Sequence, residues 1–65
     1  MYKNKIREYR KNSHMTLEEL AKKAEISIGY LCHLEKGTRR NPSVEMMERI
    51  ANALGESVSK VFFWE

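Results

Sequence analysis

The sequence predicts an all-α fold built from five short helices. Apolar side chains recur three and four residues apart along most of the chain, which is the spacing of one face of an α-helix. No stretch alternates apolar and polar side chains as a half-buried strand would. Serine, threonine and glycine stand where the apolar segments begin and end, as the caps of short helices do.

Two helices are expected before residue 25. Tyr2, Ile6 and Tyr9 form one apolar stripe, which predicts a helix from the N-terminus to about Asn12. The segment SHM interrupts it. Thr16 then precedes LEELAKKA with a glutamate three residues further on, and this capping-box pattern predicts a second helix of about two turns.

Three more helices are expected in the remainder of the chain. Ser27 can cap a third helix, and Gly37 can end it in the left-handed conformation that glycine adopts at little cost. After the loop TRRNP, a fourth apolar stripe runs from Ser43 to Gly55. Ser57 opens a last helix that carries Val58, Val61 and Phe62.

The second and third helices are joined by only EIS, the connection length of a helix-turn-helix unit. Such a turn makes the two helices cross steeply and leaves the outer face of the third helix free to enter a groove. At about 100° per residue, Leu31 and Leu34 define its buried face and Ile28 lies at the border. The predicted outer face consists of Gly29, Cys32, His33 and Lys36.

Composition excludes several kinds of protein. The single cysteine excludes an internal disulfide and a four-cysteine zinc site, and its neighbour His33 points about 100° away from it, which argues against a metal site. The charged N-terminus does not resemble a signal peptide, and no apolar run is long enough to cross a membrane. Ser13 and Ser27 have no partners for a catalytic triad, which argues against an enzyme. From these observations together we expect a soluble, cytoplasmic protein that is not an enzyme and holds no metal or cofactor.

Basic residues are concentrated in two segments of the chain. Residues 1–14 contain five basic residues and one acidic residue, and residues 26–42 contain three basic residues and one acidic residue. The other segments are net negative, and the whole chain carries a formal charge of +3. This distribution fits either a polyanion-binding face or ordinary solvated surface.

Four segments together resemble the phage-repressor and Cro type of helix-turn-helix domain, the XRE-like family: IREYRK, TLEELAKKAEIS, YLCHLEKG and RNPSVEMMERIANALGESVSKVF. The resemblance extends from Ile6 to Phe62. It implies that residues 1–65 form a single DNA-binding domain with the five-helix, lambda-repressor-like fold. It also implies duplex DNA as the partner and a symmetric homodimer on a palindromic operator.

The resemblance assigns roles to individual residues. Arg10 and Glu35 would form a half-buried ion pair between the first and third helices. Base edges would be read by Ser27, Ile28, Gly29, Cys32 and His33. DNA phosphates would be held by Thr16, Leu17, Lys36, Thr38, Arg39 and Arg40.

Three positions depart from the residues that are common in the family. Leu17 stands where relatives often have glutamine, so its side chain cannot hydrogen-bond a phosphate. His14 and Glu25 stand where relatives often have glycine, because the backbone there tends toward positive φ. A non-glycine residue in that conformation costs about 1 kcal/mol.

Alternatives remain open for two residues of the third helix. Ile28 either packs against Leu17, contacts a thymine methyl group, or belongs to a protein-binding patch. His33 either donates to guanine or to a phosphate, or is simply solvated.

The segment VFFWE holds more aromatic side chains than the small core needs. In the family that the chain resembles, the last helix and the stretch after it often contact a second copy, so the resemblance implies a dimer formed by Val58, Phe62, Phe63 and Trp64. The alternative is a monomer in which Trp64 folds back on the first helix. The expected function is that of a Cro-sized transcriptional repressor. The other candidate is an antitoxin-like subunit whose apolar Leu17, Ile28 and Trp64 surfaces hold a protein partner.

Overall fold

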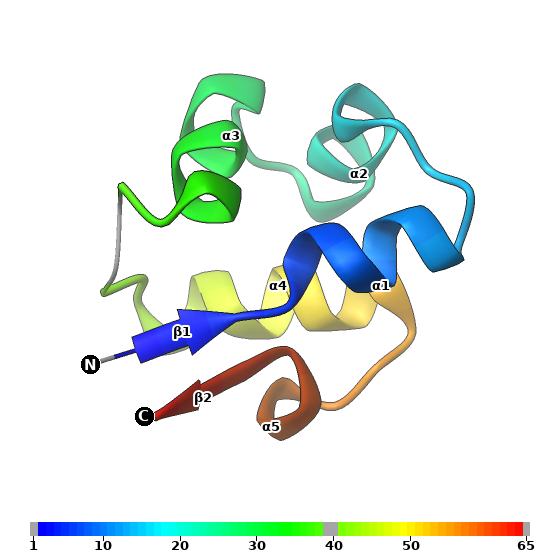
Figure 1. Ribbon diagram of the computed structural model, residues 1–65. Coiled ribbons are helices and arrows are strands. Elements are labelled where there is room, and N and C mark those ends of the chain that lie inside the picture. Colours follow the sequence, from blue (N-terminus) through cyan, green and yellow to red (C-terminus); the bar gives the residue numbers. More distant parts are fainter. Residues whose placement is uncertain (1, 39–40, 65) are drawn as a thin grey trace.

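The helices account for most of the chain, as the sequence predicts. The structure is a computed structural model that describes residues 2–38 and 41–64. In chain order these ranges contain β1 (Tyr2–Asn4), α1 (Ile6–Asn12), α2 (Leu17–Ala24), α3 (Ile28–Lys36), α4 (Val44–Leu54), α5 (Val58–Val61) and β2 (Phe62–Trp64). The five-helix fold class is therefore confirmed for the described residues. Figure 1 shows α2 and α3 at one end of the molecule and α5 with the two strands at the other.

The two strands are absent from the sequence prediction. β1 and β2 pair in antiparallel register, with Tyr2 opposite Trp64 and Asn4 opposite Phe62. The predicted helical start at Tyr2 is wrong, because Tyr2–Asn4 pair with the C-terminal segment as a strand and α1 begins only at Ile6. Phe62, predicted to be helical, lies in β2. Strands of three residues are too short to show an alternating pattern, and their partners stand at opposite ends of the chain.

Hydrogen bonds at Asn4 and Lys5 fix the point where β1 passes into α1. The Lys5 amide donates to the Val61 carbonyl (2.8 Å), which ties this segment to the end of α5. The Asn4 Oδ1 atom accepts from the Ile6 amide (3.1 Å), and its Nδ2 donates to the Leu34 carbonyl (2.9 Å) at the C-terminal half of α3.

The core is built from one apolar face of each helix together with the start of β2. Among the described residues, its largest fully buried side chains are Ile6, Leu20, Leu31, Leu34, Ile50 and Val61. Phe62 also lies in this core and is only 5% exposed. The expectation that Phe62 contributes to a dimer surface is therefore wrong, because its ring is already packed within its own chain.

The first four helices end in the same way. After each of them, a residue at positive φ reverses the chain, and the next amide donates back across the last turn. After α2, the Ile26 amide donates to the Ala21 carbonyl at 3.0 Å. The positive φ values predicted for His14 and Glu25 are confirmed, at 57° and 58°. The remaining two positions are glycines, Gly37 and Gly55.

The predicted caps form at the starts of α2 and α3. The Thr16 hydroxyl accepts from the Glu19 amide (3.0 Å), and the Glu19 carboxylate accepts from the Thr16 amide (2.8 Å). That backbone bond lowers the pKa of Glu19, so the stabilisation it gives is lost as the pH falls through the lowered pKa. The Ser27 hydroxyl accepts from the Tyr30 amide at 3.1 Å.

Arg10 and Glu35 join α1 to the C-terminal half of α3. The Arg10 Nε and Nη2 atoms donate to the two carboxylate oxygens of Glu35 at 2.9 and 2.8 Å. The third nitrogen, Nη1, donates to the Met15 carbonyl at 2.9 Å in the connection between α1 and α2. The side chains of the pair are only 13% and 10% exposed. The hydrogen bonds that Arg10 donates to the Glu35 carboxylate raise the pKa of Arg10, despite the opposing effect of burial.

We expect Glu25→Gly to stabilise the fold by about 0.5 kcal/mol, because glycine relieves the cost of positive φ at this residue. The matched control is Lys23→Gly, two residues earlier and within α2, which should destabilise by about 1 kcal/mol. Urea denaturation followed by circular dichroism measures both. Destabilisation by Glu25→Gly would show that its backbone carries no such strain.

We expect Glu35→Ala to lower the free energy of unfolding by about 3 kcal/mol, because it leaves the mostly buried Arg10 charge without its partner. The control is Glu45→Ala, which breaks the Arg49–Glu45 pair, whose side chains are 42% and 72% exposed. That change should cost less than about 1 kcal/mol. Equal losses in the two variants, measured by chemical denaturation, would contradict a structural role for the buried pair.

Candidate nucleic-acid interface

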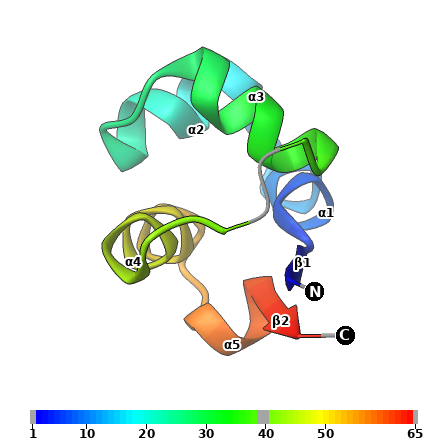
Figure 2. The same ribbon diagram turned by 90° about the vertical axis from the view of Figure 1, so that its left-hand side faces the viewer.

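Helices α2 and α3 form the predicted helix-turn-helix unit. The left-handed residue Glu25 turns the chain between them, and the Arg49 Nη1 atom of α4 donates to its carbonyl at 3.2 Å. Viewed from the side, α2 and α3 lie together on the opposite side of the molecule from α5 and β2 (Figure 2). The unit is thus supported from below by α1 and α4, and its far side faces solvent.

The outer face of α3 is the one that the helical wheel predicts. Leu31 and Leu34 are buried at 0% and 1% exposure and anchor the inner face. On the opposite face Gly29, His33 and Lys36 are exposed and Cys32 is half-buried. A methyl group added at Gly29 would meet no atom within 4 Å, so internal packing does not require glycine there. This leaves the outer face accessible to a partner.

Ile28 lies at the edge of this face and is 48% exposed. Leu17, in the first turn of α2, packs partly against the core, whereas Ile28 is not among the side chains that do so. The structure therefore presents an apolar side chain to solvent at the start of α3.

His33 and Thr38 are joined at the C-terminal end of α3. The Thr38 amide and hydroxyl both donate to the His33 carbonyl, each at 3.0 Å. The Thr38 hydroxyl oxygen also lies 2.9 Å from Nδ1 of the His33 ring. Both donors of Thr38 are thus engaged within the chain, which leaves none for the phosphate that the resemblance assigns to it.

The start of α2 contributes a different set of groups. In its capping box, Thr16 uses its hydroxyl oxygen as an acceptor, so the hydroxyl proton can still be donated outward. Leu17 can offer only its backbone amide, one of the first-turn amides that have no partner within a helix. The positive end of the helix dipole favours an anion at this point.

Two predicted phosphate contacts, Arg39 and Arg40, lie outside the described residues.

The residues that were assigned to a dimer, apart from the buried Phe62, belong to α5 and β2, at the far end of the molecule from α3 (Figure 1). Val58 and Phe63 are half-buried, and Lys5 Nζ lies 5.8 Å from the centroid of the Phe63 ring. Trp64 is 71% exposed. The structure thus separates the outer face of α3 from the surface around β2.

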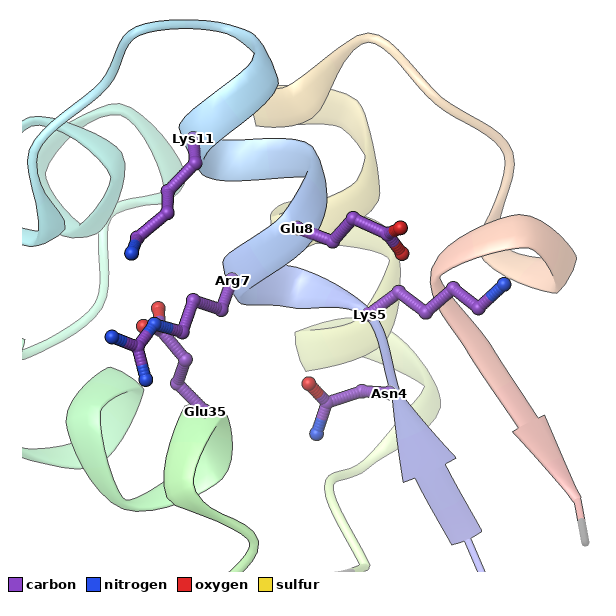
Figure 3. Close-up of a pocket in the computed structure, with 6 residues that line it drawn as sticks. All are labelled: Asn4, Lys5, Arg7, Glu8, Lys11 and Glu35. Carbon is purple, nitrogen blue, oxygen red and sulfur yellow. The ribbon is translucent and has the colours of Figure 1, made fainter.

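A hollow of about 460 Å³ lies beside the Arg10–Glu35 pair. Its lining side chains come from β1, α1, the segment between them and α3, as Figure 3 shows: Asn4, Lys5, Arg7, Glu8, Lys11 and Glu35. The Asn4 amide and the Glu35 carboxylate are already bonded within the chain. These two lining side chains therefore help to fix α3. The sequence pointed to this role for Glu35 but not for Asn4.

Residues 2–38 and 41–64 contain no group of three histidine, cysteine or glutamate side chains that could hold a metal ion. No helix in the same ranges is long and apolar enough to cross a membrane.

Comparison with known proteins gives consistent results. A family model described as helix-turn-helix matches residues 6–61. The transcriptional regulator SinR of Bacillus subtilis is 36% identical over 58 residues, which is 89% of this chain and 52% of SinR. The immunity repressor protein of Bacillus phage phi105 is 40% identical over 57 residues, which is 88% of this chain and 39% of that repressor. The chain therefore spans about half the length of these relatives, or less.

The fold is also similar to that of a solved relative. A crystal structure of SinR in complex with DNA superposes with a TM-score of 0.79 and 38% sequence identity, covering 82% of this chain and 84% of that one. The sequence motifs, the arrangement of α2 and α3 and the family match agree. The chain belongs to the XRE-like family of helix-turn-helix domains.

Proposed function

We propose that residues 1–65 act as one sequence-specific DNA-binding domain of a transcriptional repressor, with α3 in the major groove of duplex DNA. The observation that carries this proposal is the solvent-facing outer side of α3 on a helix whose inner side is fully anchored. The similarity of this chain to SinR, whose structure has been determined in complex with DNA, supports the same interpretation. A helix of this kind fits the major groove, where base pairs present distinct donors, acceptors and methyl groups.

Base reading is assigned to the first two turns of α3. The Ser27 hydroxyl accepts the capping bond and keeps its proton for donation to a base or phosphate. The exposed Ile28 side chain suits the methyl group of thymine, the apolar feature of the major groove. Gly29 lets the backbone approach the bases closely. Cys32 and His33, one turn further along, complete the proposed reading surface.

Phosphate contacts are assigned to groups on both sides of α3. The Thr16 hydroxyl and the Leu17 amide lie at the start of α2, where the helix dipole favours an anion. Lys36 is exposed near the end of α3. Arg39 and Arg40 follow in the sequence and are proposed to bind phosphates of the same DNA strand as Lys36. Such contacts fix the register of the protein, whereas base contacts determine the sequence.

A homodimer on a palindromic operator is part of the proposal. Trp64, with Val58 and Phe63 beside it, provides the surface for the second copy, and buried Phe62 supports that surface from within. Binding to successive turns of DNA requires that the two α3 helices of the dimer lie about 34 Å apart.

A protein partner is the second candidate. It is favoured by the exposure of two large apolar side chains, Ile28 at 48% and Trp64 at 71%. Contact with a partner protein would remove this apolar surface from water.

Selection of bound duplexes from a random pool at about 150 mM salt tests the proposed function. We expect a palindrome with half-sites about one helical turn apart, bound by a species with twice the mass of the chain in light scattering. An enriched single half-site bound by a monomer would contradict the dimer. Weak, salt-sensitive binding without an enriched sequence would contradict base reading and favour the protein partner.

On the selected site, Lys36→Ala should weaken binding similarly for all sequences and lower the slope of log affinity against log salt by about one unit, because one phosphate contact is lost. The control is Lys60→Ala on α5, which removes the same charge at the other end of the molecule (Figure 1). Its salt slope should match that of the wild type. A changed base preference in Lys36→Ala would assign Lys36 to a base edge.

A further inference from the structure

The His33 ring has one nitrogen held inside the chain and one facing out. Nδ1 lies 2.9 Å from the Thr38 hydroxyl oxygen, and the same hydroxyl lies 3.0 Å from the His33 carbonyl oxygen. His33 itself is exposed on the outer face of α3. Nε2, on the other side of the ring from Thr38, is therefore the nitrogen that a partner of this face meets.

We propose that Thr38 fixes the neutral His33 ring with its proton on Nδ1, so that Nε2 is a hydrogen-bond acceptor. On this basis His33 selects a base that offers an amino group in the major groove, adenine or cytosine, at the position that it faces. This inference rests on the proposed function for its DNA part, whereas the state of the ring is a property of the free protein.

The position of the Thr38 hydroxyl between the His33 carbonyl oxygen and the ring atom Nδ1 carries the argument. A threonine hydroxyl has one proton to donate and lone pairs with which to accept. If that proton is directed to the His33 carbonyl, the hydroxyl oxygen accepts from Nδ1–H and both short contacts are hydrogen bonds. If it is directed to Nδ1 instead, two oxygen atoms face each other at 3.0 Å with no proton between them. The first arrangement satisfies every group.

The backbone holds Thr38 in this place. Gly37 ends α3 at a φ of 83°, and the Thr38 amide then donates to the His33 carbonyl at 3.0 Å. This is the same helix-ending bond that closes the other long helices. Thr38 is thus a positioning residue for His33, and its hydroxyl proton is not available to a phosphate.

Whether Nε2 of His33 accepts or donates a hydrogen bond determines which base it prefers. A neutral imidazole protonated on Nδ1 can only accept at Nε2. In the major groove adenine offers its N6 amino group and cytosine its N4 amino group, whereas guanine offers only the acceptors N7 and O6. An acceptor facing guanine would leave both groups without a proton, so guanine is disfavoured. Of the roles that the sequence leaves open for His33, this state of the ring disfavours donation to guanine.

Nitrogen NMR of the free protein tests the state of the ring. In mildly alkaline buffer, where imidazole is neutral, we expect the Nδ1 resonance of His33 to have the shift of a protonated nitrogen and Nε2 that of an unprotonated one. A His33→Gln variant assigns the signals against His14. Thr38→Val removes the hydroxyl and should reverse the preference toward Nε2–H, while Thr38→Ser keeps the hydroxyl and should preserve it. An Nε2–H ring in the wild type, or equal spectra for Thr38→Val and Thr38→Ser, would overturn the proposal.

Duplex selection with the same variants tests the consequence. The wild type and Thr38→Ser should prefer adenine or cytosine over guanine about tenfold at one position of each half-site, and Thr38→Val should lose that preference. A preference for guanine in the wild type would overturn the assignment. Uniform weakening by Thr38→Val with the preference intact would show that Thr38 contacts a phosphate. If no sequence is selected at all, the proposed function fails, while the NMR result still decides the state of the ring.

Discussion

The ion pair between Arg10 and Glu35 is the contact on which the presentation of α3 depends. Arg10 bonds to both carboxylate oxygens of Glu35 and to the Met15 carbonyl, so one side chain joins α1, the start of the helix-turn-helix unit and the second half of α3. Because the pair is mostly shielded from water, removing either partner would leave a charge without compensation. Asn4 adds a bond to the Leu34 carbonyl from the N-terminal strand. α3 is therefore fixed by polar bonds on one side and by Leu31 and Leu34 below.

This fixation separates the stability of the domain from the identity of the side chains that face outward. Gly29 has no packing role, and His33 reaches only its own helix end. Substitutions on that face can therefore change what is recognised without disturbing the core. The Thr38 hydroxyl, placed at the end of α3, lies 2.9 Å from Nδ1 of His33, so the end of the helix also contacts a side chain of its outer face.

The opposite end of the molecule follows a different constraint. The helices alone do not cover the C-terminal residues. The pairing of β1 with β2 holds this segment against the core and brings Tyr2–Asn4 beside Phe62–Trp64. Phe62 is thereby drawn inward, while Trp64 remains largely exposed. The strand pair thus decides which aromatic residues belong to the core and which form a surface for the second copy that we propose.

The five helices, their caps and the inner and outer faces of α3 could be predicted from the residues alone, because they depend on local spacing and on residues a few positions apart. Through a family resemblance, the sequence also pointed to positive φ at His14 and Glu25 and to the pairing of Arg10 with Glu35. The strand pair, the burial of Phe62 and the bond between Thr38 and His33 could not be predicted in this way and are seen only in the folded chain. These depend on groups brought together by the fold: three-residue strands at opposite ends of the chain, and a hydroxyl placed by a glycine turn. Neither the strand pair nor the position of this hydroxyl can be predicted from the spacing of apolar residues along the sequence.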